Sequence, residues 1–392
     1  MPTQDVSSLL ALTLTPGLGP TLIARCLDAL GPADSLLHTI QHHPDRLTAI
    51  KGISPKGATA IQAGLRQVHD DDLVPRELER VEKHNAHLLA IDDPRYPALL
   101  RHIPDPPPLL WVKGQLTEDD ALALGIVGSR KATHYGREQA HRLAADAARA
   151  SLTVVSGGAY GIDAAAHHGC LDAQGRTLAV IGSGLAKPYP QDHTDLFAQI
   201  IAPDPDTGQP RGAVLSELPL LTPPHATHFP RRNRIISGLA LGTLVVEAAL
   251  RSGALITARQ CAEDHGRELM VLPGRVDSKQ SAGCHKILRE GWGTLVTSIA
   301  DILDTLGETG QLLKAQTIAE NQSATQNAPA TADASPTTPV HQAILDNLTD
   351  PRSLDELIAL TDLDASTLRA QLTLLEIQGR IQRTGALFKR KS

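Results

Sequence analysis

Aromatic residues are scarce in this 392-residue chain, which contains two tryptophans, four tyrosines and three phenylalanines. Proteins that bind single strands on a β-barrel or an RNA-recognition sheet stack the bases on exposed aromatic rings. The shortage of rings argues against a platform of either type. If the chain binds a nucleic acid, we expect it to hold mainly the phosphate backbone.

The patterns of several other protein classes are also missing. The four cysteines lie far apart with no C-x-x-C pair, which argues against a disulfide framework or a zinc site. The 17 histidines show no metal-ligand spacing, and the adjacent His167 and His168 diverge on a helix, so we expect no metal. No segment has a signal-peptide pattern or the roughly 18 apolar residues of a membrane span, which predicts a cytoplasmic protein without membrane contact.

Positive charge is concentrated locally, although the formal net charge is −6. Arg231, Arg232 and Arg234 lie close together, and a second basic group forms the C-terminal tail. Phosphate binding depends on such local clusters more than on the average charge. We expect the three arginines to contact phosphate.

Composition and pattern divide the chain into four parts. Residues 1–75 predict a small helical domain of the helix-hairpin-helix or SAM-like type, whose Gly-rich turns either contact DNA or serve only helix packing. Residues 307–338, rich in Ala, Thr, Gln, Pro and Ser, predict a flexible linker. Residues 339–392 predict a winged-helix domain. Its helical patterns lie near 339–348, 353–361 and 365–378, its hairpin at 379–391, and its expected N-caps are Ser353 with Glu356, and Asp364 or Ser366.

Residues 85–306 predict an α/β domain with an extended Rossmann-like parallel sheet and helices on both faces. The strand-like runs lie at 121–127, 152–155, 177–181, 213–215, 243–246 and 268–272. They alternate with helical patterns near 135–150, 161–172, 192–202, 231–240, 253–265 and 283–290. A Pro-rich segment from about 85 to 120, with a strand-like stretch from Leu109 to Val112, is expected to lead into this domain.

Two Gly-rich turns follow the first two strands of this predicted sheet. They contain Gly128, Ser129 and Arg130 in the first turn, and Ser156, Gly157, Gly158 and Gly161 in the second. A turn between the carboxyl end of a strand and a helix can present backbone N–H groups to an anion, so we expect both turns to bind phosphate. Asp163 is expected to cap the following helix, while Glu217 and Glu247 are expected to position arginines or backbone amides.

The common nucleotide-binding signatures are absent. No G-x-G-x-x-G follows the first strand, and no G-x-x-x-x-G-K-[ST] occurs in the chain. We therefore expect no cofactor and no catalytic residues.

Several segments, in this order, resemble the DprA/Smf family of DNA-processing proteins between about residues 85 and 305. They are Gly128-Ser129-Arg130, Ser156-Gly157-Gly158-Ala159 with Gly161-Ile162-Asp163, Gly182 and Gly184 before Tyr189-Pro190, Ser216-Glu217, Phe229 with Arg232-Asn233-Arg234-Ile235-Ile236-Ser237-Gly238, and Glu247-Ala248 with Ser252-Gly253 and Thr257-Ala258. The resemblance implies a homodimer that binds and protects single-stranded DNA and loads RecA onto it during natural transformation and homologous recombination. It implies no enzymatic turnover.

The same resemblance implies a DNA site made of the two turns and the arginine segment. Its candidate residues are Gly128, Ser129, Arg130, Ser156, Gly157, Gly158, Gly161, Lys187, Arg231, Arg232, Asn233 and Arg234. After Tyr189-Pro190 this chain has Gln191-Asp192-His193, where many members carry a basic residue and an Asn. Lys187 is expected to compensate for this difference.

Two other classes fit the sequence less well. Nucleoside-monophosphate phosphoribohydrolases of the lysine-decarboxylase-like class share the sheet, the Gly-rich turns and a Gly-Thr followed by Glu, here Gly242-Thr243 and Glu247, but their P-G-G-x-G-T-x-x-E signature is absent. A winged-helix transcription factor would not need the dominant α/β domain. Base release from AMP would indicate the first class, and a duplex footprint the second.

Overall fold

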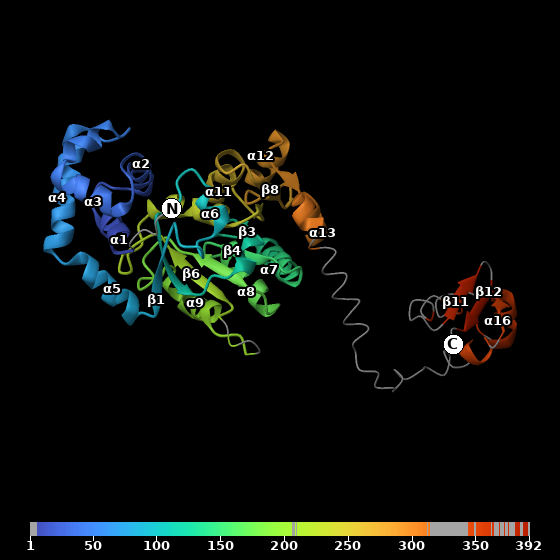
Figure 1. The fold of residues 1–392 in the computed structure, drawn as a ribbon. Coiled ribbons are helices and arrows are strands. Elements are labelled where there is room, and N and C mark those ends of the chain that lie inside the picture. Colours follow the sequence, from blue (N-terminus) through green and yellow to red (C-terminus); the bar gives the residue numbers. More distant parts are fainter. Residues whose placement is uncertain are drawn as a thin grey trace. The chain divides into compact units, whose positions relative to one another are not determined.

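The computed structural model describes residues 6–205, 208, 210–311, 313, 344–348, 350–361, 363, 368, 372, 375, 381–384 and 387–390 (Figure 1). The chain forms two compact units, Met1–Asn321 and Gln322–Ser392. The residues predicted as a helical domain and as a Rossmann-like domain thus lie together in one unit. Among the described residues, no helix is both long and apolar enough to cross a membrane.

A nine-stranded sheet lies at the centre of the first unit, in the spatial order β1-β2-β6-β5-β4-β3-β7-β8-β9. The strands are β1 (Ala86–Ala90), β2 (Leu109–Gly114), β3 (Ala123–Val127), β4 (Thr153–Ser156), β5 (Thr177–Val180), β6 (Gly212–Ser216), β7 (Gly242–Val245), β8 (Glu268–Val271) and β9 (Thr294–Leu295). Strands β3 to β9 pair in parallel, which confirms the predicted fold class. The six predicted strands were also placed correctly, because continuous apolar runs mark strands that are buried on both faces.

The sheet becomes mixed at one edge, which the sequence did not predict. Strand β1 pairs antiparallel with β2, and β2 pairs antiparallel with β6. Three residues of β1, Ala86 to Leu88, are only half-buried, as expected at a sheet edge. Its apolar run is correspondingly short, which explains why the segment resembled a simple connection.

Helices cover both faces of the sheet. One face carries α7 (His134–Arg149), α8 (Ile162–Asp172), α9 (Thr194–Ile201) and α13 (Ile299–Thr305), and the other carries α6 (Ala98–Arg101), α10 (His228–Leu239), α11 (Ala254–Arg259), which continues as a π-helical turn (Gln260–Asp264), and α12 (Ala282–Glu290). Alternate residues of β3 serve the two faces, with Leu124 and Ile126 in one core cluster and Ala123 and Val127 in the other. Short 3₁₀ turns occur at Glu118–Ala121 and Gln191–His193.

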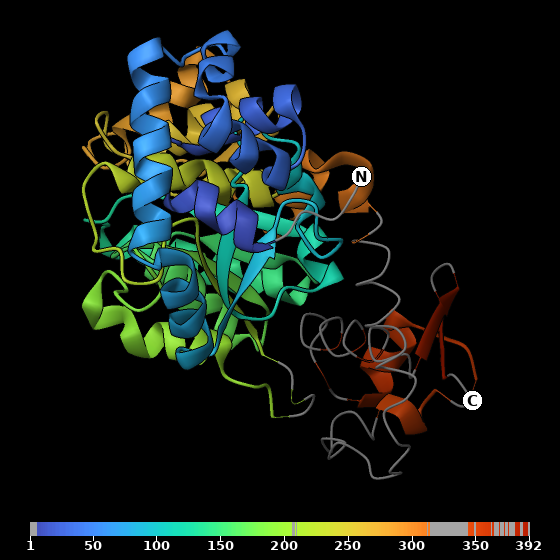
Figure 2. The ribbon, with the colours of Figure 1, turned by 60° about the vertical axis from the view of Figure 1, so that its left-hand side comes forward.

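The N-terminal helices share a core with the sheet (Figures 1 and 2, blue). They are α1 (Val6–Leu14), α2 (Pro20–Leu30), α3 (Ala33–His42), a 3₁₀ helix (Pro44–Ala49), α4 (Pro55–Asp70) and α5 (Leu73–Lys83). Glu77 of α5 is buried, and its Oε1 accepts hydrogen bonds from Trp111 Nε1 at 3.0 Å and from the Leu220 amide at 2.6 Å. This carboxylate ties the helices to β2 and to the loop after β6.

The second unit has a small core of its own. The described elements of this unit are β10 (Arg352–Ser353), α16 (Leu354–Thr361), β11 (Ile381–Thr384) and β12 (Leu387–Arg390), with the strands in the order β10-β12-β11. Glu356 accepts a hydrogen bond from the Ser353 amide at 2.8 Å, which confirms the predicted cap. The pairing of β11 with β12 confirms the predicted hairpin.

Several predictions for the C-terminal part lie wholly or partly outside the described residues. Of the predicted linker, residues 307–311 are helical and Leu313 is buried against the first unit's core, whereas 314–338 lie outside. The caps Asp364 and Ser366, and most of the helix predicted at 365–378, also lie outside; within that helix, Leu368, Leu372 and Leu375 are helical and buried.

Candidate nucleic-acid interface

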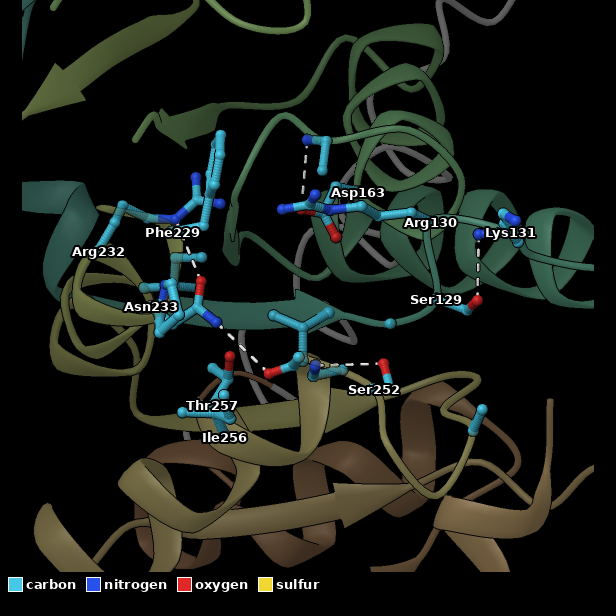
Figure 3. Close-up of a pocket in the computed structure, with 18 of the residues that line it drawn as sticks. Ser129, Arg130, Lys131, Asp163, Phe229, Arg232, Asn233, Ser252, Ile256 and Thr257 are labelled. Atoms are coloured by element: carbon cyan, nitrogen blue, oxygen red, sulfur yellow. Dashed lines mark hydrogen bonds between the residues drawn. The ribbon is translucent and has the colours of Figure 1, made fainter. Parts of the chain in front are cut away.

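A large cavity lies where the order of the parallel strands reverses. From β3 the chain proceeds to β4, β5 and β6 on one side, whereas β7, on the other side of β3, is followed by β8 and β9. The loops after β3 and β7 therefore separate, and a crevice opens at the carboxyl ends of the strands. The cavity there has a volume of about 800 Å³ and is lined by both loops, the start of α8 and one side of α10 (Figure 3).

Arg130 is an exposed cation in this pocket. Its guanidinium carbon lies 4.8 Å from the centroid of the Phe229 ring, and the side chain reaches from the loop after β3 towards α10 (Figure 3). Within the part of the chain that the structure describes, no carboxylate lies within ion-pair distance of it. Its planar set of N–H donors is therefore oriented by the ring and available to an oxyanion.

Gly128 and Ser129 shape the loop that carries Arg130. The Ser129 amide donates to the Glu247 carbonyl at 2.7 Å, and its hydroxyl donates to Gln280 Oε1 at 3.0 Å. A side chain at Gly128 would collide with Ile162 and with the same carbonyl. These two residues thus hold the loop against its neighbours more than they offer groups to a ligand.

In the second Gly-rich turn, backbone amides donate to a carboxylate of the protein itself. Asp163 is buried and accepts hydrogen bonds from the amides of Ala159, at 3.3 Å, and Gly157. Asp163 lies in the first turn of α8, as its charge predicted, but it does not cap the helix: the N-cap is Gly161, and no side chain makes a cap hydrogen bond there. The carboxylate instead occupies two amides that were expected to face phosphate. Burial raises the pKa of this carboxyl above its usual range, although Arg232 opposes the rise.

The other residues of the second turn are structural. Ser156 is buried and donates to the Ile126 carbonyl at 2.6 Å. Gly158 and Gly161 have positive φ angles of 63° and 80°. A side chain at Gly161 would overlap the carbonyl of Ser129, so this glycine permits the two turns to approach each other.

Arg232 points inward rather than into the solvent. It is 4% exposed, and its Nη1 donates to the carbonyl oxygens of Gly157, at 2.6 Å, and Val180. Burial lowers its pKa to about 10, while Asp163 acts in the opposite direction. The expected phosphate contact is thus replaced by contacts that support the second turn, and Arg232 forms part of the pocket wall.

Arg234 lies outside the pocket and is 3% exposed. Its guanidinium pairs with both oxygens of Glu217, at 3.0 and 2.7 Å, and with Asp105 at 2.9 Å. The prediction that Glu217 positions an arginine is confirmed. Because these carboxylates neutralise Arg234, we do not include it in the proposed interface.

The remaining candidates are divided between the pocket and its surroundings. Asn233 lines the pocket, and its Nδ2 donates to the Gly253 carbonyl at 3.4 Å. Arg231 and Lys187 are exposed but lie outside the lining, and Arg231 is 3.7 Å from Glu217. These two residues can contact a strand only beyond the pocket.

Sequence reasoning missed two further cations that line the pocket. Lys131 and Arg251 are both exposed and follow β3 and β7, the strands that flank the crevice. Their positions next to Arg130 and Ser252 were the available signal, because loops at a topological switch point face the ligand. Glu247 supports the same wall, since it accepts hydrogen bonds from the Thr133 amide at 2.9 Å and hydroxyl at 2.6 Å. This bears out its predicted role in positioning amides.

Comparison with known proteins agrees with this architecture. The family model described as DNA recombination-mediator protein A matches residues 87–307, and the DprA winged helix domain matches residues 328–386. Protein Smf of Synechocystis sp. is 32% identical over 97% of this chain and 98% of its own length. Protein Smf of Escherichia coli is 42% identical over 58% of each chain.

A solved structure shows the same likeness. DNA processing protein A of Streptococcus pneumoniae is 31% identical and superposes with a TM-score of 0.65 over 77% of this chain and 98% of its own. The family match covers the sheet, both Gly-rich turns and the arginine segment that form or support the pocket. The chain therefore belongs to the DNA recombination-mediator protein A family, the DprA/Smf family of DNA-processing proteins.

Proposed function

We propose that the protein binds and protects single-stranded DNA in the pocket at the β3–β7 switch point and delivers the strand to RecA in natural transformation and homologous recombination. The exposed Arg130, oriented over Phe229, is the observation that carries the proposal. Lys131 and Arg251 add positive charge beside it. Asp163 is the carboxylate in the described lining and interacts electrostatically with Arg232 and Arg130. Four cations, Arg130, Lys131, Arg232 and Arg251, line the same cavity, so positive charge still prevails there.

The size of the pocket favours unpaired nucleotides over a duplex. A cavity of about 800 Å³ matches ligands of nucleotide size, whereas a duplex presents its phosphates on the outside of a wide rod. Single strands can turn individual phosphates and bases into such a recess. The strand is therefore expected to bind by its backbone and without strong sequence preference.

We infer a binding role without turnover because the acidic groups around the pocket are already committed. Asp163 holds amides of its own turn, Glu247 holds Thr133, and Glu217 holds Arg234. A general base must reach the proton that it abstracts, and these carboxylates are turned towards the protein. The proposal also includes three features that we expect from the sequence and the family resemblance. They are RecA as a partner, a homodimer and a cytoplasmic location.

The test is salt-dependent binding to matched single-stranded and duplex oligonucleotides. We expect tighter binding to the single strand than to the duplex. Arg130→Ala should weaken single-strand binding and reduce the slope of log K against log salt by the amount that corresponds to about one phosphate contact. Arg149→Ala is the matched control, because Arg149 ends α7, which runs from the carboxyl end of β3 to the amino end of β4, away from the pocket. The proposal would be contradicted if the protein bound both DNAs equally and Arg130→Ala left that binding unchanged. Release of base from AMP would indicate a phosphoribohydrolase instead.

A further inference from the structure

A second hollow lies beside the DNA pocket, between α11 and α12. Its volume is about 300 Å³. Arg251, Ser252, Gly253 and Ile256 line both cavities. The loop after β7 and the start of α11 are thus a shared wall, and a ligand that crosses this wall passes from one cavity into the other.

The second hollow combines positive charge with apolar surface. Arg251, Arg259 and Lys286 line it, and the described lining contains no carboxylate. Glu290 lies outside that lining, 3.9 Å from Lys286. Ile256 is 41% exposed. Cations beside apolar faces are what the phosphates and bases of a single strand require.

Trp292 gives this hollow an aromatic surface. Gly291 ends α12 with a φ of 74°, and the chain then turns so that the Trp292 amide donates to the Ile287 carbonyl at 3.4 Å. The half-buried indole is held by a hydrogen bond from Nε1 to Glu290 at 3.1 Å. The chain's other tryptophan, Trp111, is completely buried. Trp292 is therefore the tryptophan that a ligand can reach.

We propose that a single strand bound at Arg130 continues across Ser252 and Gly253 into the second hollow. There a base stacks on Trp292, and the adjoining phosphates contact Arg251, Arg259 and Lys286. This inference rests on the proposed function and adds a second subsite to it. A strand that is too short to cross the shared wall occupies only the first pocket.

Tryptophan fluorescence tests the second subsite in the full-length protein. Oligothymidylates of increasing length are the probe, and buried Trp111 supplies a constant background. We expect short oligonucleotides to bind without changing the emission, and longer ones to quench it. Trp292→Leu should abolish the quenching and weaken binding of long oligonucleotides about tenfold, with short ones unaffected. Arg259→Ala should reduce the salt dependence only for the long ones.

The outcomes separate the two proposals. If Arg130→Ala weakens binding while long strands cause no quenching and bind Trp292→Leu normally, the second subsite is wrong and the first pocket stands. If neither variant changes binding, the proposed function fails. If the emission changes with protein concentration and not with added DNA, a second copy of the chain covers Trp292, and the proposed subsite is also wrong. Arg149→Ala again serves as the charge control.

Discussion

At the scale of single residues, the three arginines of α10 have three different environments. Successive residues on a helix point about 100° apart, so Arg231, Arg232 and Arg234 cannot all face one ligand. Arg232 points to the carbonyls of the sheet, and Arg234 to Glu217 and Asp105. Their clustering in the sequence therefore overstated the positive charge available to DNA.

Arg232→Ala is expected to lower stability. The change leaves two buried carbonyls and the buried Asp163 without their cationic partner, which typically costs about 3–5 kcal/mol. Arg130→Ala removes an exposed side chain and should change the free energy of unfolding by about 0.5 kcal/mol or less. Urea denaturation of both variants measures the difference. A stable Arg232→Ala protein with a reduced salt slope would instead show that Arg232 contacts phosphate directly.

At the scale of elements, the two Gly-rich turns act as one assembly. The amide of Ile162, the first residue of α8, donates to the Ser129 carbonyl at 3.2 Å, and Gly161 permits the close approach that this bond requires. The position of Arg130 therefore depends on the second turn as well as on its own. Sequence patterns located both turns, because each follows a buried strand, but they did not show that one supports the other.

Gly161→Ala should disturb both stability and DNA binding. The added methyl group would overlap the Ser129 carbonyl, and the alanine backbone would have to keep a φ of 80°. We therefore expect the free energy of unfolding to fall by about 1–3 kcal/mol and Arg130 to be displaced. Gly266→Ala is the matched control, because Gly266 has a φ of 60° with no atom near the added carbon. That control should lose about 1 kcal/mol or less and bind DNA normally. Denaturation and binding assays on both variants check the distinction, and normal binding by Gly161→Ala would contradict the coupling of the turns.

At the scale of the whole molecule, the sequence correctly predicted the central strands, the winged unit and the position of both Gly-rich turns at the carboxyl ends of parallel strands. These succeeded because buried strands are continuous apolar runs and because loops at the carboxyl ends of parallel strands converge. The half-buried edge strand β1 has too weak a pattern to be recognised. The partners of the arginines were also hidden, since Glu217 and Asp105 reach Arg234 from distant parts of the chain.

Deleting residues 340–392 should leave single-strand binding largely intact. Among the described residues, those that line the pocket all belong to the first unit, and the second unit has a separate core. Binding of single-stranded oligonucleotides by the truncated and full-length proteins makes the comparison. Complete loss of binding on truncation would move the DNA site to the winged unit.

The carboxylate of Asp163 has a consequence for how firmly a strand is held. Because Asp163 occupies amides of the second Gly-rich turn, only a few side-chain cations of this pocket remain to contact DNA. We expect a site with few phosphate contacts to show a weak dependence of affinity on salt and to release a bound strand readily. Under the proposed function, such a hold suits a protein that shelters a strand briefly and then gives it up to another.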